Sequence, residues 1–584
     1  MAVIGIDLGT TNSLVSVWQN GEALIIPDPL GNIMQPSIVA INQEGKMLTS
    51  WAAKEEVFQH PECGVSGFKR DMGSGKEYRL GDKAYRSEEL SAMMLQKLKG
   101  IAEDYLKEEV EEAIISVPAY FDNEQRYATK VAAKLAGIKC QRILNEPSAA
   151  ALAARYQNTE DEEYMLVFDF GGGTLDVSIV DCFENLIEIT AISGDNKLGG
   201  RDFDACIARY YCEKNNISWE DMDSKMKTYL LQEAQNVKET LTYRETCSMR
   251  CHGNGAEHEV VFDEKLLFEL GKDLFDRIKQ VIERAVFDSG LSLEEISKIL
   301  LVGGSSKMPV IQKYLKKLFG REVDITGDAE ELVAKGVGVY TAIKTRQEEV
   351  QDIVMTDVCP FSLGTDVIAY NSPETNNVRN FVMIERNSVL PARVTDQFWT
   401  TKDGQQQIVY NIYQGENFDP RKNTLLGKLK VEVPPDKAGV QSSTLTFTYD
   451  LNGILLVEAV CDATGEQYEL MVSGKLKRMN GNKMNEIKKQ LKSMEFLSEE
   501  EQQKKTIFDM GNRLYENTTG ELRSYIENIL IRYQMMTASR SRINMRKVGR
   551  EVLQTLLRIE NELKQSVFDM EKLADIEELF ENKE

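Results

Sequence analysis

Two short loops of similar composition could bind phosphate in this chain. Each begins with an aspartate and continues with glycine and threonine: Asp7-Leu8-Gly9-Thr10-Thr11-Asn12 and Asp169-Phe170-Gly171-Gly172-Gly173-Thr174. Because glycine has no side chain, backbone N–H groups in such turns can approach phosphate oxygens closely. Neither loop has the spacing of a Walker loop or of a dinucleotide-binding fingerprint. The pair predicts a nucleotide site built from two similar halves.

Each loop lies between two apolar runs that predict β-strands. Residues 3–6 and 14–17 flank the first loop, and residues 165–168 and 177–180 flank the second. Each loop is therefore expected to join the strands of a hairpin. Either loop alone is compatible with an ordinary hairpin turn. A third glycine pair, at residues 303–304, favours a nucleotide site to which all three loops contribute.

Composition excludes several classes of protein. With 584 residues the chain is too long for one core, and three or four domains are expected. A net charge of -23 argues against nucleic acid as the main partner. Three histidines leave little for a Ser-His or His-metal mechanism, and nine scattered cysteines indicate reduced thiols.

The apolar pattern predicts no membrane segment and no leader. No run approaches the roughly 18 consecutive apolar residues of a membrane helix. The sequence enters its first predicted strand directly after Met1 and Ala2, which leaves no room for a signal peptide. We therefore expect a cytoplasmic protein that makes no membrane contact.

The character of the sequence changes along the chain. Residues 1–348 alternate short apolar runs with helical patterns, which is typical of a mixed α/β domain. A short charged stretch, 349–358, predicts a linker. Residues 359–473 contain alternating strands separated by turn residues and predict a β-sandwich. Residues 474–584 predict helices, since leucine, isoleucine and methionine recur there at helical spacing.

The order of the motifs resembles that of the DnaK-type heat-shock chaperones. Between and after the two phosphate loops come the segments 114–121, 145–151, 198–204 and 303–309. The resemblance spans the whole chain, and the segments 68–73, 356–360 and 413–417 are closest to the HscC-type branch of the family. It implies an α/β actin-like two-lobed ATPase domain, followed by a β-sandwich that binds peptide and an α-helical lid.

The resemblance also implies roles at the nucleotide site, with ATP or ADP and Mg²⁺ as cofactors and K⁺ as a further candidate. Lys69 would contact the γ-phosphate and the attacking water, and Glu146 would lie near that water. Asp7 and Asp169 would hold Mg²⁺ through its water ligands, as suits a cation that dehydrates reluctantly. Thr174 and Asp176 would lie beside the γ-phosphate. The other expected nucleotide contacts are Gly9, Thr10, Thr11, Asn12, Gly171, Gly172, Gly173, Gly199, Gly200, Lys238, Thr242, Gly303, Gly304, Ser305 and Lys307.

The chain departs from the family pattern at three positions. Lys307 and Glu239 stand where most members have arginine, and lysine stacks less well on adenine. We therefore expect weaker nucleotide binding or an easier release. In the linker, Thr356 replaces an apolar residue, which would weaken coupling by about 1 kcal/mol if it is desolvated. Pro118 and Arg126 resemble the relay between nucleotide and linker.

In the sandwich, an extended peptide would be held by backbone hydrogen bonds and one side-chain pocket. Strand lengths place Ile408 and Tyr410 at this pocket with Phe398 nearby, and Ile368 and Thr401 at an arch over the peptide. The alternative is that these residues are sandwich core. Thr401 is polar where an arch residue is often apolar, so the substrate preference is expected to differ from that of general chaperones.

The function implied by the resemblance is an ATP-dependent chaperone for protein folding and the stress response. It would bind unfolded or extended hydrophobic segments, act as a monomer, and serve few clients. A J-domain co-chaperone is the expected partner, with a nucleotide exchange factor as a further candidate. The chain ends without the acidic tetrapeptide of eukaryotic cytosolic members, which favours bacterial-style partners.

Two other classes of function remain as alternatives. The first is a small-molecule kinase of the actin-like superfamily, in which an aspartate deprotonates a sugar hydroxyl. The predicted sandwich and lid argue against it, because such a kinase needs neither. The second is a nucleotide-binding adaptor with weak or uncoupled ATPase, which the atypical linker and adenine site leave open.

Overall fold

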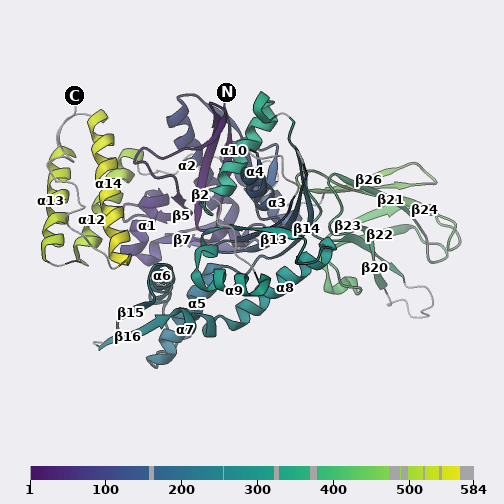
Figure 1. Cartoon of the computed structure of the whole chain (residues 1–584). Helices are drawn as coiled ribbons and strands as arrows, with labels where there is room; N and C mark the ends of the chain where they lie inside the picture. The colour runs from purple at the N-terminus through teal and green to yellow at the C-terminus, as the bar shows by residue number, and fades with distance from the viewer. Residues whose placement is uncertain are drawn as a thin grey trace.

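The computed structural model describes residues 2–156, 163–183, 185–253, 256–320, 328–350, 352–368, 378–471, 498–516, 520–537 and 542–565, together with Ile487 and Thr518. These residues form a two-lobed α/β domain, a β-sandwich and a group of C-terminal helices (Figure 1). Among them, no helix has both the length and the apolar character needed to cross a membrane. The predicted boundary between sandwich and helical tail, at 473–474, lies outside the described residues.

The first lobe is built on a sheet with the strand order β11-β10-β1-β2-β3. Its strands are β1 (Ala2–Asp7), β2 (Asn12–Gln19), β3 (Glu22–Ile25), β10 (Val110–Val117) and β11 (Ile143–Asn145), with β4 (Gln35–Pro36) paired to β2. Successive residues of β1 face opposite sides of the sheet. Ile4 packs with α2 (Ser87–Leu106) on one side, and Gly5 lies against Val337 of α10 (Leu332–Thr345) on the other. Helix α3 (Asn123–Leu135) packs beside α2.

A smaller unit is inserted in this lobe between β4 and α2. It contains a three-stranded sheet with α1 packed on it, and a separate hairpin. The elements are β5 (Ile38–Ile41), β6 (Met47–Thr49), α1 (Ser50–Gln59), β7 (Gly64–Ser66), β8 (Glu77–Leu80) and β9 (Lys83–Arg86). The short 3-10 helix η2 (Phe68–Asp71) lies between the sheet and the hairpin, and it brings Lys69 to the nucleotide site.

The second lobe repeats the topology of the first. In each sheet a loop hairpin continues into a third antiparallel strand, and a later strand pairs with the first in parallel. The sheet order is β17-β12-β13-β14-β18, with β12 (Glu163–Phe170), β13 (Leu175–Phe183), β14 (Leu186–Asp195), β17 (Ile296–Val302) and β18 (Val354–Thr356). Both predicted phosphate-loop hairpins are confirmed, as β1–β2 and β12–β13.

The remaining helices of the ATPase-like domain surround the second sheet or link the lobes. They are α4 (Glu146–Arg155), α5 (Gly200–Lys214), α6 (Ser224–Thr240), α7 (Glu264–Leu270), α8 (Lys272–Ser289) and α9 (Pro309–Phe319). A hairpin, β15 (Thr246–Gly253) and β16 (Ala256–Asp263), packs beside α6. The 3-10 helix η3 (Gly304–Lys307) follows β17 and carries the third glycine loop.

The sandwich consists of two antiparallel four-stranded sheets. One has the order β20-β19-β22-β23, from β19 (Leu363–Ile368), β20 (Val378–Ile384), β22 (Gln407–Gln414) and β23 (Thr424–Glu432). The other has the order β21-β24-β25-β26, from β21 (Ala392–Trp399), β24 (Ser442–Tyr449), β25 (Leu455–Cys461) and β26 (Gln467–Met471). Alternate residues of facing strands form a shared core, as the pattern of burial along β22 and β25 shows.

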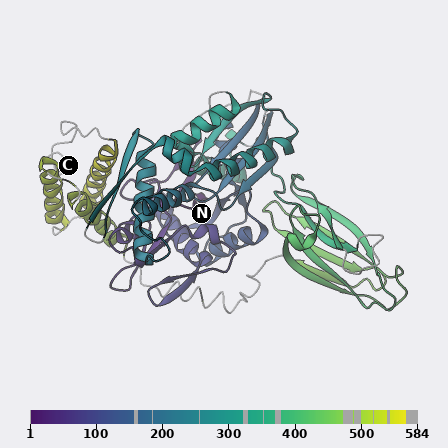
Figure 2. The same cartoon turned by 90° about the horizontal axis from the view of Figure 1, so that it is seen from below.

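The C-terminal helices do not cover the sandwich in this structure. α12 (Glu499–Glu516), α13 (Gly520–Thr537) and α14 (Arg542–Gln565) pack on one another and against α1 of the first lobe. The sandwich lies at the opposite end of the molecule, beside β14 and α8 (Figures 1 and 2). The part that the family resemblance describes as a lid is therefore held away from the sandwich.

Candidate nucleotide site

The first phosphate loop begins where β1 ends. Asp7 is the last residue of that strand, and Ser116 Oγ of β10 donates a 2.7 Å hydrogen bond to Asp7 Oδ1. Gly9 N donates to Ser13 Oγ at 3.2 Å, and Ser37 Oγ donates to Gly9 O at 2.8 Å. These bonds fix the turn through its own backbone. The loop can thus present its remaining N–H groups to an anion.

The two phosphate loops face each other across the lobes. A Cβ atom on Gly172 would lie 2.1 Å from Thr11 Oγ1, so only glycine permits this approach. Arg70 adds a link between the lobes: its Nε donates to Gly173 O at 2.7 Å, and its Nη2 lies 2.6 Å from Asp202 Oδ2. Arg70 was not among the residues predicted for the site. Its position beside Lys69 in η2 was the available signal.

Lys69 and Glu146 form a buried ion pair at the site. Lys69 Nζ lies 2.7 Å from Glu146 Oε1, and both side chains are almost completely shielded from solvent. Glu146 is the first residue of α4, and Pro147 suits the first turn of that helix. The pair places a cation and a carboxylate side by side, as is needed to neutralise a transferring phosphoryl group and to orient a water.

Carboxylates outnumber cations in this site. Asp169 and Asp176 are directly opposite each other in the β12–β13 pairing, and one oxygen of each, Oδ2, is buried with no hydrogen-bond partner within the described part of the chain. Burial raises the pKa of Asp176 to about 7, with Glu146 as the next cause. The same two causes raise the pKa of Asp7 to about 7 and the pKa of Asp169 well above its usual value.

This excess of negative charge fits a cation, because a positive charge would favour the ionised carboxylates. In the described part of the chain, no group of three His, Cys, Asp or Glu side chains is arranged to ligate a metal directly. A metal held through its water ligands agrees with that finding. Asp7 and Asp169 are the two residues that the sequence predicts as acceptors for such waters, and both are buried carboxylates with a raised pKa.

Several of the other predicted nucleotide contacts converge from three elements. Gly200 N donates to Gly171 O at 3.0 Å, and a Cβ on Gly200 would lie 2.3 Å from Ser305 Oγ. Lys238 Nζ of α6 donates to Gly200 O at 3.1 Å and pairs with Asp204 at 2.7 Å. The loops containing Gly199, Gly303 and Gly304 are therefore brought to the second phosphate loop.

Two residues that depart from the family pattern are held by neighbours. Lys307 Nζ lies 2.6 Å from Glu330 Oε2 and 2.8 Å from Asp328 Oδ1. Glu239 accepts a 2.8 Å hydrogen bond from Gln235, one turn earlier on α6. Thr242 follows the end of that helix, half-buried. With two acidic partners, the Lys307 ammonium is directed to carboxylates of its own lobe.

Arg126 connects the nucleotide site to the sandwich. Its Nη2 donates to Asn145 Oδ1 at 2.8 Å and to Ala119 O at 2.9 Å, so it lies beside the residue that precedes Glu146. A Cβ on Gly453, in the turn between β24 and β25, would lie 2.7 Å from Arg126 Cδ. Pro118 begins the same segment, and its carbonyl accepts from Phe121 N at 3.1 Å. Arg126 thus contacts both the nucleotide lobe and the sandwich.

The linker docks on the second sheet. β18 adds to the edge of β14 in parallel, from Leu186 opposite Val354 to Glu188 opposite Thr356. Ile353 is buried, whereas the buried Thr356 Oγ1 has no hydrogen-bond partner among the described residues. Ser148 Oγ of α4 donates to Asp357 Oδ1 at 2.5 Å. Helix α4 therefore begins at the nucleotide site and also binds the end of the linker.

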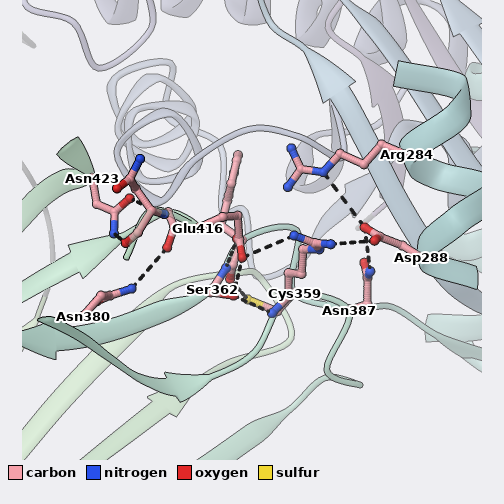
Figure 3. A network of polar contacts seen from close by, with 12 residues as sticks. Arg284, Asp288, Cys359, Ser362, Asn380, Asn387, Glu416 and Asn423 are labelled. Carbon is pink, nitrogen blue, oxygen red and sulfur yellow. Dashed lines mark hydrogen bonds and ion pairs between the residues drawn. The ribbon is translucent and has the colours of Figure 1, made fainter. Parts of the chain in front are cut away.

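A polar network joins the second lobe to the sandwich (Figure 3). Arg386 lies at its centre, with Nη2 at 2.6 Å from Asp288 of α8 and Nη1 at 3.4 Å from Glu416. Ser362 donates to Glu416 through both its N–H and its hydroxyl, each at 2.8 Å. Asp288 is buried and Figure 3 shows Arg284 and Asn387 converging on it. These residues were not predicted from the sequence, because their contacts form only when the second lobe and the sandwich dock.

The five predicted peptide-pocket residues occupy two kinds of position. Ile408 and Tyr410 point into the sandwich core, and Phe398 packs beside them, with its ring centroid 5.4 Å from that of Tyr410. Ile368 ends β19 with an exposed side chain, and Thr401 is exposed just beyond β21. This geometry is compatible with both alternatives: the residues could belong to the sandwich core, or they could line a peptide pocket at its edge.

Comparisons with known proteins agree with these observations. The family model described as Hsp70 protein matches residues 3–79 and 74–580. The chaperone protein DnaK of Thermotoga petrophila is 35% identical over 527 residues, which cover 88% of this chain and 86% of the relative. The DnaK of Thermotoga sp. strain RQ2 gives the same values. With its duplicated lobes, its sandwich and its C-terminal helices, this chain belongs to the Hsp70 family.

Proposed function

We propose that this protein is an ATP-dependent chaperone that binds extended, mostly apolar peptide segments under the control of its own ATP hydrolysis. The family assignment supports the ATP-dependent chaperone activity. The observation that carries the coupling is the double role of α4. Glu146 at its start pairs with Lys69, and Ser148, two residues along the same helix, binds Asp357 of the linker. A change at the nucleotide would be felt by the linker through one rigid element.

In the proposed reaction, Lys69 neutralises charge on the transferring phosphoryl group and Glu146 orients the attacking water. Thr174 and the backbone of both glycine loops hold the phosphates, and Asp176 lies beside them. Asp7 and Asp169 would hold Mg²⁺ through water, where the ion supplies positive charge to the phosphates. ATP and ADP bound across the two lobes would keep the loops of Thr11 and Gly172 together.

The arrangement of domains supports a state in which the peptide site is open. The helical group packs on the first lobe through α1, at the far end from the sandwich. Closure over a peptide would require these helices to leave α1 and the linker strand β18 to leave β14. We infer that the described arrangement is the peptide-releasing state, favoured by ATP.

The finer assignments rest on sequence features. We propose a cytoplasmic monomer of the HscC-type branch with few clients, a J-domain co-chaperone, and an exchange factor as a further partner. The Thr356 hydroxyl is buried and finds no partner in the part of the chain that the structure describes, which supports weaker coupling than in general chaperones. The ion pairs of Lys307 with Asp328 and Glu330 support weaker nucleotide binding. If the coupling were lost altogether, the protein would be the second candidate, a nucleotide-binding adaptor with uncoupled ATPase.

One kinetic experiment separates the two candidates. The dissociation rate of a fluorescent apolar heptapeptide is measured in ADP and again after addition of ATP, for the wild type and for Lys69→Ala. We expect ATP to accelerate release in both proteins, and hydrolysis to fall by about a hundredfold or more only in the variant. Lys46→Ala, directly after an exposed turn of the first lobe and with a half-exposed side chain, serves as the matched control. Peptide release that does not respond to ATP would establish the adaptor.

A further inference from the structure

Thr365 is a buried polar residue that the family resemblance did not single out. It lies on β19 directly opposite Phe381 of β20 and Ile412 of β22, on the face that looks into the sandwich. Its side chain is completely buried, and Thr365 Oγ1 has no hydrogen-bond partner among the described residues. A threonine that only filled space there could be replaced by valine without loss of volume. The hydroxyl therefore needs an explanation.

Thr365 marks the point where two strands of the sheet separate. Pairing between β19 and β22 ends at Thr365 and Ile412. Beyond it, β19 continues to pair with β20 up to Ile368, and β22 continues to pair with β23 back to Gln407. The Asp366 carboxylate bridges the seam by accepting from Asn411 Nδ2 at 2.9 Å. The Thr365 hydroxyl thus lies at the point where β19 and β22 stop pairing.

A second unpaired hydroxyl comes from the other sheet. Ser443 of β24 lies opposite Phe398 of β21, is completely buried, and has no partner for its Oγ among the described residues. Tyr410 reaches from the first sheet to Ser443 O, but at 3.4 Å its hydrogen bond is longer than an ordinary O–H···O bond. Its hydroxyl therefore retains most of its capacity for another partner.

Aromatic residues pair with both hydroxyl residues across neighbouring strands, Phe381 with Thr365 and Phe398 with Ser443. The Phe398 ring centroid lies 5.5 Å from that of Phe381 and 5.4 Å from that of Tyr410, so it bridges the two strands that flank β19. The cluster combines apolar walls with two hydroxyls that lack partners. An occupant with an apolar stem and a hydrogen-bonding end would satisfy both features, whereas an aliphatic side chain would leave the hydroxyls unpaired.

We propose that this cluster is the specificity pocket of the sandwich, and that it selects client segments presenting a hydroxyl or carboxamide side chain: serine, threonine, asparagine or glutamine. Thr365 and Ser443 supply the hydrogen bonds, and Phe381, Phe398 and Tyr410 supply the walls. The inference rests on the proposed function, because it names the substrate class of the peptide site. It implies that apolar residues flank a polar anchor in each client segment.

The test uses the full-length protein in ADP and pairs of fluorescent heptapeptides that differ only by threonine or valine, placed at each position in turn. Threonine and valine have nearly the same shape, so the comparison isolates the hydroxyl. At one position we expect the threonine peptide to bind about tenfold more tightly than its valine partner. Thr365→Val should abolish this preference, and Thr365→Ser should retain it.

Thr448→Val is the matched control, since Thr448 lies in the same sandwich on the outward face of β24. It should leave the preference unchanged. If Thr365→Val unfolds, Ser443→Ala provides an independent variant. It should reduce the preference. Binding of both peptides with no preference at any position, or a preference that survives both substitutions, would overturn the inference while leaving the chaperone activity intact. Failure of every peptide to bind the wild type would instead overturn the proposed function, and the pocket with it.

Discussion

At the scale of single residues, the nucleotide site is short of positive charge. Asp7, Asp169, Asp176 and Glu146 are buried together, and Lys69 is the cation that acts on all of them. A buried carboxylate that lacks a compensating charge takes up a proton more readily. The protein without nucleotide and metal should therefore hold protons at this site near neutral pH.

This proton uptake predicts a pH-dependent effect of Asp176→Asn on stability. In the unfolded chain an aspartate loses its proton near pH 3.9, whereas burial raises the pKa of Asp176 to about 7 in the fold. Between these values only the folded state holds the proton, so the residue's contribution to the free energy of unfolding falls as pH rises. Asp176→Asn removes this pH-dependent loss of stability. Its melting temperature relative to wild type should rise from about pH 5 to about pH 8.

The measurement is thermal unfolding without nucleotide or Mg²⁺. Asp82→Asn, at an exposed turn, is the control and should show no such trend. A difference between Asp176→Asn and wild type that stays constant across this range would contradict the assignment of the titration to Asp176.

Residues of the site were predictable where short motifs carry them. Lys69, Glu146 and Asp169 each stand in a short segment whose local sequence identifies it, and the structure brings them to one place. Arg70 and Thr365 were not predicted. Arg70 matters because it contacts Gly173 of the other lobe. Thr365 matters because its hydroxyl lacks a hydrogen-bond partner among the described residues. Neither property is visible in the local sequence.

At the scale of elements, the linker strand β18 predicts a gain of coupling on Thr356→Val. The valine would fill the same volume and remove a buried hydroxyl for which the described residues offer no hydrogen-bond partner. Docking of β18 on β14 should become more favourable by about 1 kcal/mol. Hydrogen exchange of the backbone amides of 354–356 in the presence of ATP should slow about fivefold.

The opposite substitution supplies the control for this prediction. Ile353→Thr places a hydroxyl at a buried position of the same segment and should accelerate the exchange. ATP-stimulated peptide release should follow the same order, fastest in Thr356→Val and slowest in Ile353→Thr. Equal exchange in all three proteins would show that docking of the linker strand does not depend on these side chains.

Elements were predicted well wherever alternation is local. The β1–β2 and β12–β13 hairpins follow from two apolar runs around a glycine turn. The pairing of β18 with β14 was not predicted. It joins segments far apart in sequence, and three residues of linker do not specify the strand to which they add.

At the scale of the whole molecule, the placement of the C-terminal helices depends on a few charged contacts. Arg513 of α12 lies 3.2 Å from Glu55 of α1 and 2.8 Å from Glu560 of α14, and its guanidinium lies over the Phe58 ring. Lys505 lies 2.8 Å from Glu56. No sequence pattern connects residues this far apart, so the helical tail was predicted and its docking site was not.

Arg513→Ala should release these helices from the first lobe. Glu55 has almost no exposed surface, and burial already opposes its charged form, so loss of the arginine leaves a buried carboxylate without its cation. Breaking such a pair costs about 3 kcal/mol, and this cost shifts the equilibrium toward release of the helices from the first lobe even with ATP bound. ATP should then accelerate peptide release far less than in the wild type, and a fluorophore pair on α1 and α12 should report a larger separation.

Arg523→Ala is the matched control, because Arg523 of α13 stacks on Tyr515 within the helical group and its loss leaves the docking surface intact. If Arg513→Ala released peptide as fast as Arg523→Ala, the contact between α12 and α1 would be a consequence of the open state and not one of its causes.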